Sequence, residues 1–311
     1  MGTIHRTGCV LCPQNCGLEV EVENNRIVKV RGDKGNVRSE GYVCRKGLNI
    51  ANHQHNADRL KYPLKRVGDR FERISWEQAI DEIGGKIREI VDRYGPRSFA
   101  YMGGGGQGCH FEAAFGVRLL RGLGSRYHYS ALAQEFSGMF WANGRMHGRQ
   151  TLLAEIDAEE TDFLLVFGWN GMQSHQIPQA PRHLLRIAKD PDKSLVVIDP
   201  RLSETAKVAN LHLAIRPGTD ALLLRAMIAI ILREGWENRD YIAHHTSGLD
   251  AIRGLFTDFD ARAAVRTCNL DFDQVHEVCR QFATRKSCLR YDLGLMMNRH
   301  SAVSSYLVVV L

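Results

Sequence analysis

The sequence predicts an α/β protein: a small β-rich N-terminal domain, residues 1–60, followed by a doubly wound, mostly parallel α/β sheet, residues 61–311. Two observations carry this prediction. Apolar and polar residues alternate on both sides of Asn24-Asn25, which is the pattern of a β-hairpin. From about residue 75 onward, short apolar strands alternate with helical periods. That alternation is typical of a parallel sheet with helices on both faces.

Length and composition are those of a folded globular chain. The 311 residues, 44% hydrophobic and 24% charged, are enough for about two domains. The formal net charge is +6 and the charges are interspersed, so nothing predicts a nucleic-acid partner. No apolar run approaches the roughly 20 residues of a membrane span. The first eight residues hold no signal segment, so we expect a soluble cytoplasmic protein without direct membrane insertion.

The N-terminal domain is predicted around the hairpin of residues 18–31. The first fifty residues hold half of the eight cysteines but too few large apolar residues for a core of their own. Something other than side-chain packing must therefore hold this part together.

The elements of the α/β region are predicted in order along the chain. Ser75 and Gln78 form a capping-box pattern at the start of a helix. A strand at 98–102, a glycine run at 103–106 and a helix at 110–123 follow. The later strands are expected at 162–167, 194–198, 211–215 and 288–293, and the later helices at 220–233, 250–256 and 271–283. The chain ends in an apolar segment, and we expect it to be a fragment of a longer protein.

Four cysteines have the spacing of a metal site. Cys9, Cys12, Cys16 and Cys44 give C-x2-C-x3-C-x27-C, with three thiols in one loop and the fourth beyond the hairpin. Soft sulfur ligands suit zinc and iron–sulfur clusters alike. Structural zinc usually takes two paired cysteine knuckles, and Cys44 has no second cysteine beside it. The spacing therefore favours a 4Fe-4S cluster, with structural zinc as the alternative.

Lys46 lies two residues beyond the fourth predicted ligand, where a cation stabilises the reduced state of an anionic cluster. The remaining cysteines have no partner at metal-ligand spacing. We interpret them as small core residues: Cys109, Cys268, Cys279 and Cys288.

Polar segments at the ends of successive strands predict a nucleotide-containing cofactor. Open α/β sheets bind ligands at the carboxyl ends of their strands. Acidic side chains there can accept from ribose or guanine, and arginines and helix N-termini can hold pyrophosphate. The glycine run lacks the P-loop ending and the acidic residue of a dinucleotide fingerprint, so ordinary NAD binding is not expected. The strand-end segments are 167–170, 197–201 and 216–220.

These motifs together resemble the molybdopterin-containing oxidoreductases of the dimethyl sulfoxide reductase type. The resemblance rests on the four cysteines with Arg45-Lys46-Gly47, and on three later segments: Gly168-Trp169-Asn170 with Ser174-His175, Val197-Ile198-Asp199-Pro200-Arg201 with Thr205-Ala206, and Arg216-Pro217-Gly218-Thr219-Asp220-Ala221. It implies a 4Fe-4S cluster that exchanges electrons with molybdenum or tungsten held by bis(molybdopterin guanine dinucleotide). It also implies a small-molecule substrate, oxidised or reduced by two electrons, and electron-transfer subunits as partners.

The resemblance implies roles for single residues. Lys46 takes the place of the electron relay between cluster and pterin. The dinucleotide contacts are expected to be Asn170, Asp199, Arg201, Thr205, Gly218 and Asp220. The protein ligand of the metal is expected near residues 131–137, where Gln134 is the metal-proximal position. That segment holds no cysteine, which disfavours formate oxidation.

Two other functions stay open from the sequence. One is an iron–sulfur electron-transfer subunit of the same fold without molybdenum. The other is a non-enzymatic module built on structural zinc. The strand-end motifs disfavour the first, because a chain without the dinucleotide has no physical need of them.

Overall fold

The computed structural model describes residues 2–12, 14–103, 110–152, 155–174 and 176–311. By its contacts the chain divides into two compact units, residues 1–131 and 132–311. The sequence analysis divided the chain at residue 60, between the part expected to bind the cluster and the part expected to bind the dinucleotide. That division stays a prediction. Most of the glycine run, Cys109 and His175 lie outside the described residues.

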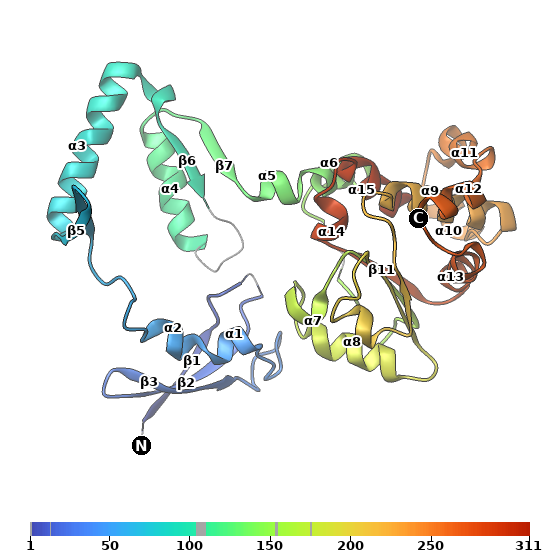
Figure 1. Cartoon of the computed structure of the whole chain (residues 1–311), viewed down its shortest axis with the longest axis horizontal. Helices are drawn as coiled ribbons and strands as arrows, with labels where there is room; N and C mark the ends of the chain where they lie inside the picture. The colour runs from blue at the N-terminus through green and yellow to red at the C-terminus, as the bar shows by residue number, and fades with distance from the viewer. Residues whose placement is uncertain (1, 13, 104–109, 153–154, 175) are drawn as a thin grey trace. The chain divides into compact units, whose positions relative to one another are not determined.

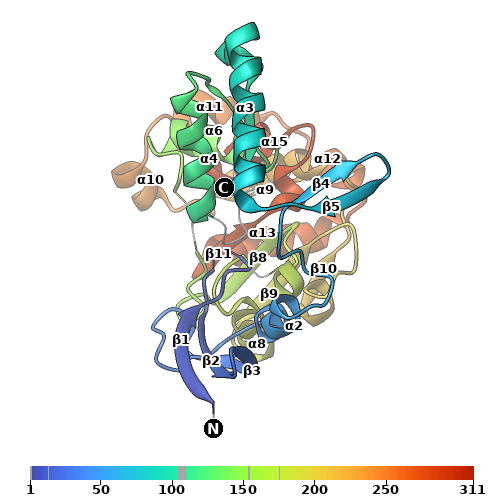
Figure 2. The ribbon, with the colours of Figure 1, turned by 90° about the vertical axis from the view of Figure 1, so that its left-hand side faces the viewer.

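The first unit begins with a three-stranded antiparallel sheet. Its strands are β1 (Thr3–Gly8), β2 (Gly17–Glu23) and β3 (Arg26–Gly32), in the order β1-β2-β3. They run side by side near the N-terminus (Figure 2). The predicted hairpin is confirmed: Asn24 and Asn25 have φ of 49° and 59°, the left-handed values that a tight turn between strands requires. The buried core of this sheet is small and consists of Cys9, Leu18 and Val20.

Short elements and one long helix follow in the first unit. They are α1 (Arg45–Leu48), α2 (Ile50–Gln54), the hairpin β4 (Leu64–Val67) and β5 (Arg70–Arg73), and α3 (Trp76–Tyr94). Ser75 caps α3 as predicted, since its hydroxyl accepts from the Gln78 amide at 3.1 Å. The reciprocal half of the capping box does not form, because the Gln78 side chain donates to Glu82 instead.

The predicted strand at 98–102 is present as β6 (Ala100–Gly103), but it belongs to a separate sheet. It pairs in parallel with β7 (Tyr127–Ser130) across α4 (His110–Gly122), and these two strands form their own two-stranded sheet. A strand followed by a helix most often pairs with the next strand along the chain. That next strand, β7, was not predicted, because four mostly polar and aromatic residues carry little periodicity.

The second unit contains the predicted parallel sheet. Its four strands run in the order β10-β9-β8-β11, and each neighbouring pair is parallel. Their bounds are β8 (Phe163–Phe167), β9 (Ser194–Ile198), β10 (Leu211–Leu213) and β11 (Ser287–Tyr291). The three strand ends that the sequence analysis singled out therefore lie on adjacent strands, β8, β9 and β10.

Helices cover both faces of this sheet, which confirms the doubly wound α/β class (Figure 1). Alternate side chains of a strand point to opposite faces. Leu164 and Val166 pack with α8 (Ala180–Lys189), whereas Phe163, Leu165 and Phe167 pack with α9 (Asp220–Glu234) and its neighbours. The apolar residues of β8 are thus buried on both sides.

The remaining helices of the second unit are mostly short. None of the helices that the structure describes is both long enough and apolar enough to cross a bilayer. Their bounds are α5 (Leu132–Glu135), α6 (Ser137–Met146), α7 (Gly171–Ser174), α10 (Arg239–His245), α11 (Leu249–Thr257), α12 (Ala261–Thr267), α13 (Phe272–Thr284), α14 (Leu293–Met296) and α15 (Ser301–Val310).

Candidate functional site

The first three predicted cysteine ligands lie in the loop between β1 and β2. The loop is closed at its base by a hydrogen bond from the Cys9 amide to the Cys16 carbonyl at 2.8 Å. Inside it, Asn15 takes φ of 48° and its amide donates to the Cys12 carbonyl at 3.2 Å. The loop between β1 and β2 thus carries three of the four cysteines.

Cys44 reaches the same loop from a distant part of the chain. It is the residue that precedes α1, and the first turn of α1 packs on the loop through Gly47. A Cβ on Gly47 would lie 3.5 Å from the Cys9 sulfur and only 2.5 Å from a methyl group of Val43. Gly47 therefore lets the backbone of α1 pack closely against Val43 and the cysteine loop.

The electrostatics of the loop show that Cys9 and Cys16 are affected by the other thiols. Burial raises the pKa of Cys9, and the neighbouring Cys12 and Cys44 raise it further. The pKa of Cys16 is raised by burial first and then by Cys12, Cys9 and Cys44. Like charges in one place disfavour ionisation of each. A nearby positive charge is therefore needed to stabilise these thiols in their ionised form.

Lys46 supplies part of that positive charge. Its side chain is exposed on helix α1, and its positive charge lowers the pKa of Cys9. The predicted relay residue therefore lies within electrostatic reach of a predicted ligand. No described cysteine is in a disulfide. In the described part of the chain no three His, Cys, Asp or Glu side chains are grouped as ligands of a single metal ion.

The predicted dinucleotide contacts lie in the second unit, and two of them are hydrogen-bonded to each other. Asn170 follows β8 and Thr205 follows β9. The Asn170 side-chain oxygen accepts from the Thr205 amide at 3.1 Å and from the Thr205 hydroxyl at 2.9 Å. The same hydroxyl accepts from the Met172 amide at 3.1 Å. Thr205 is fully buried, so this link joins the two strand ends firmly.

Glu204 completes this network and was missed by the sequence analysis. Its Oε2 accepts from Asn170 Nδ2 at 2.6 Å and from Arg201 Nη2 at 3.2 Å. The hydrogen bond from Asn170 lowers the pKa of Glu204 most, and all causes together lower it to about 2. Only its position, three residues after a predicted contact, could have indicated it, because a surface glutamate has no motif of its own.

Two predicted acids come together at the ends of β9 and β10. Asp199 directly follows β9, and its Oδ1 accepts from the Arg201 amide at 2.8 Å. Asp220 begins α9 and is buried, which raises its pKa, and the charge of Asp199 raises it further. Two neighbouring carboxylates offer several acceptors to the N–H and O–H groups of a nucleoside.

The turn before α9 has the features expected of an anion-binding helix start. Gly218 has φ of 80°, which favours glycine, and no atom lies within 4 Å of where its Cβ would be. Thr219 precedes the helix, but its hydroxyl donates to the Arg216 carbonyl and does not cap the helix amides. Thr219, the residue that precedes the helix, therefore does not cap the first turn of α9 with its side chain.

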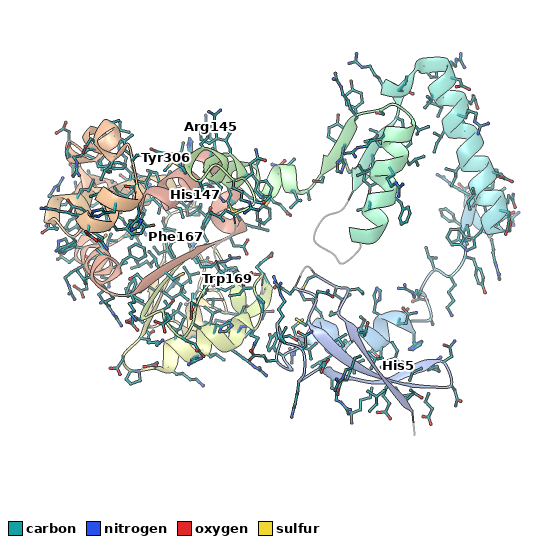
Figure 3. The ribbon with its side chains drawn as sticks, turned by 180° about the vertical axis from the view of Figure 1, so that it is seen from behind. His5, Arg145, His147, Phe167, Trp169 and Tyr306 are labelled. Atoms are coloured by element: carbon teal, nitrogen blue, oxygen red, sulfur yellow. The ribbon has the colours of Figure 1, made fainter. Side chains whose placement is uncertain are left out.

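Two more polar groups lie at this edge. Trp169, within the strand-end segment singled out from the sequence, is completely buried after β8 (Figure 3), and among the described residues its indole Nε1 has no hydrogen-bond partner. Asp292, directly after β11, is 4% exposed. Burial raises the pKa of Asp292 to about 6, against the opposing charge of Arg290. Asp292 was missed by the sequence analysis, because its buried state depends on the tertiary structure and not on a motif along the chain.

The predicted residues are divided between the two compact units. The cysteines and Lys46 belong to the first compact unit, and the dinucleotide candidates belong to the second. Gln134 lies on α5, with an exposed side chain, and its metal-proximal role stays a prediction.

The chain combines a cysteine loop with a doubly wound sheet that has polar groups at the carboxyl ends of its strands. This combination is typical of a cofactor-dependent redox protein. The chain belongs to the molybdopterin oxidoreductase family: the family model of that description matches residues 59–276. The model of the molybdopterin oxidoreductase Fe4S4 domain matches residues 3–56, which include all four predicted cysteine ligands. The family resemblance seen in the sequence is therefore confirmed.

Similar proteins are considerably longer than this chain. It is 29% identical over 263 residues to the probable oxidoreductase YyaE of Bacillus subtilis, a match that covers 82% of this chain and 38% of the relative. It is 29% identical to a nitrate reductase of Symbiobacterium thermophilum over 298 residues, 91% of this chain and 39% of the relative. The chain thus spans about two fifths of the length of these relatives.

A solved structure has the same fold. The acetylene hydratase of Pelobacter acetylenicus aligns with a TM-score of 0.79 and 23% identity, over 98% of this chain and 42% of that one. At this identity the likeness establishes the architecture alone.

Proposed function

We propose that this chain is the cluster-binding and first dinucleotide-binding part of an oxidoreductase that uses molybdenum or tungsten in bis(molybdopterin guanine dinucleotide). The observation that carries the dinucleotide part is the edge formed by β8, β9 and β10. There a carboxylate pair, an arginine and a helix start that its N-cap residue Thr219 does not cap lie on adjacent strand ends. Acceptors for a base and donors for phosphates are thus present together.

The cysteine loop supports the cluster part of the proposal. It supplies four thiols, and the pKa values of Cys9 and Cys16 are raised by burial and by the other thiols. Four such thiols are the donor set of a 4Fe-4S cluster. Binding to iron removes the mutual repulsion by neutralising the thiolates. Family membership through the Fe4S4 domain supports the same assignment.

When bound, the cluster supplies one-electron transfer, and the pterin-held metal supplies the two-electron chemistry at a small-molecule substrate. The residues of this chain bind and orient these groups. Lys46 places a positive charge beside the cysteine loop and favours the reduced cluster. Asp199 and Asp220 accept hydrogen bonds from the nucleoside, and Arg201 and the start of α9 hold phosphate oxygens. Gln134 is proposed as the metal-proximal residue.

The proposal includes partners and a location. Electrons that pass through a cluster must be exchanged with a further redox protein, so we propose electron-transfer subunits as partners. A cytoplasmic location is part of the same proposal, because thiol ligands stay reduced there.

The proposed cofactors are tested by anaerobic purification of the chain followed by metal analysis and a visible spectrum. About four irons per chain, with a broad band near roughly 400 nm, are expected. Molybdenum or tungsten in addition would show that this part of the protein retains pterin. Iron without either metal would favour an electron-transfer role, and one zinc without iron would contradict the redox proposal.

Replacing Lys46 with alanine is expected to leave the iron content unchanged and to shift the cluster reduction potential to more negative values. The loss of one nearby positive charge disfavours the added electron, by on the order of tens of millivolts. Redox titration followed by electron paramagnetic resonance measures this shift. Lys29→Ala, an exposed lysine of β3, is the matched control. Equal cluster reduction potentials in wild type and Lys46→Ala would show that Lys46 is a surface charge without influence on the cluster.

A further inference from the structure

Glu204 has two partners of different strength at the sheet edge. One is Asn170, whose amide donates to Glu204 Oε2 at 2.6 Å. The other is Arg201, whose Nη2 donates to the same oxygen at 3.2 Å. One carboxylate oxygen thus holds both a predicted amide contact and the predicted phosphate-binding guanidinium.

The Asn170 link is the permanent one. Asn170 is fixed on its other side by two hydrogen bonds from Thr205, a residue with no exposed surface. A short hydrogen bond to an ionised acceptor is among the strong ones. Of the causes that lower the pKa of Glu204, the bond from Asn170 is the largest and that from Arg201 ranks lower.

The Arg201 link is the exchangeable one. The Arg201 side chain is 63% exposed and that of Glu204 38% exposed. Exposed ion pairs contribute little to stability and are screened by salt. Glu204 uses one of the five N–H donors of the guanidinium. A phosphate can accept two parallel N–H bonds from an arginine, which a single contact at 3.2 Å cannot match.

We propose that Glu204 is a positioning residue of the dinucleotide edge that holds Asn170 permanently and holds Arg201 only until a phosphate of the nucleotide replaces it. This inference rests on the proposed dinucleotide function. Before binding, Glu204 keeps the guanidinium beside the Asn170 network, where the nucleotide is expected. After binding, its charge stays close to the phosphates and weakens their binding. Glu204 therefore sets the affinity through two opposing effects.

Two substitutions separate these effects. Glu204→Gln keeps an oxygen that can accept from Asn170 but removes the charge. Glu204→Ala removes both. Guanosine 5′-diphosphate is the probe, because it carries the base, the ribose and two phosphates. We expect Glu204→Gln to bind it about fivefold more tightly than wild type at low salt. The gain should diminish at high salt, since both side chains are exposed. Glu204→Ala should bind more weakly than Glu204→Gln.

The controls use the full chain and the same titration calorimetry. Glu159→Gln removes an equal charge and breaks a similar exposed pair, with Arg186 at 3.0 Å, before the start of β8. It should bind the probe as wild type does. Neutral guanosine should bind equally to wild type and Glu204→Gln, because it has no phosphate to repel. Arg201→Ala should weaken binding of the diphosphate, because it removes the guanidinium that is proposed to hold the phosphate.

The outcomes distinguish the inference from the function on which it rests. Tighter, salt-sensitive binding by Glu204→Gln, with Glu204→Ala weaker than Glu204→Gln, supports the inference. Equal or weaker binding by Glu204→Gln, in a wild type that binds the probe, overturns it and leaves the dinucleotide function standing. A gain that also occurs with guanosine or with Glu159→Gln overturns it as well. Absence of binding by wild type and all variants contradicts the dinucleotide function itself.

Discussion

Cys12→Ala is expected to lose the iron–sulfur cluster and to unfold about the first fifty residues. The sheet of β1, β2 and β3 has only three buried core residues, and one of them, Cys9, is itself a proposed ligand. A core of this size cannot hold the segment without a metal group. Iron analysis and limited proteolysis of the purified chain measure both effects, and iron should fall from about four per chain to nearly none.

The matched control for this prediction is Cys288→Ala. Cys288 lies on β11, in the second unit, and is a cysteine to which we assign no ligand role. Its replacement should leave the iron content and the proteolysis pattern of residues 1–50 unchanged. Full iron content in Cys12→Ala would contradict the assignment of the cysteine loop.

Asp292→Asn is expected to increase the free energy of unfolding at pH 8 and to leave it nearly unchanged at pH 4. Burial raises the pKa of Asp292 from 3.8 to about 6 in the folded state. A raised pKa means that the folded state binds the proton more tightly than the unfolded state. The contribution of protonated Asp292 to the folding stability is then fully present below pH 3.8 and is lost as the pH rises through 6. The charged carboxylate thus costs about 3 kcal/mol above that range.

Denaturant unfolding at pH 4 and pH 8 tests this prediction. Asparagine retains an oxygen that can accept from the Leu293 amide but carries no charge to desolvate. The exposed Asp258→Asn serves as the control and should show no such pH-dependent gain. A gain of equal size at both pH values, or a loss at pH 8, would contradict the buried-charge explanation.

The four strands of the second unit and its helices α9, α11 and α13 were predicted because each is determined by a local pattern, whereas shorter helices such as α10 and α12 were not predicted. The apolar runs of β8 and β9 are buried on both faces, so their sequence is continuously hydrophobic. The short strand β7 has no such run and was missed. Its absence from the prediction also led to the expectation of one sheet, where the structure has a separate pair of β6 and β7.

Candidate residues were recognisable where the chemistry depends on spacing along the chain. The cysteines, Asp199 and Asp220 stand within short motifs, next to glycine and arginine, and the fold places the two acids close together. Glu204 and Asp292 have no motif. Their roles depend on which residues of other strands lie beside them, 34 residues away in sequence in the case of Asn170 and Glu204.

The sequence by itself determined the family, the class of fold and the residues that carry a cofactor signature, because hydrophobic periodicity and ligand spacing are local properties of the chain. The tertiary structure alone decided which polar groups share a hydrogen bond and which carboxylate is buried. Hydrogen bonds and desolvation act over a few ångströms in space, whatever the separation along the chain. For this reason only the structure showed that Asn170 and Thr205 link two strand ends, that Glu204 accepts from Asn170, and that Asp292 is a buried acid.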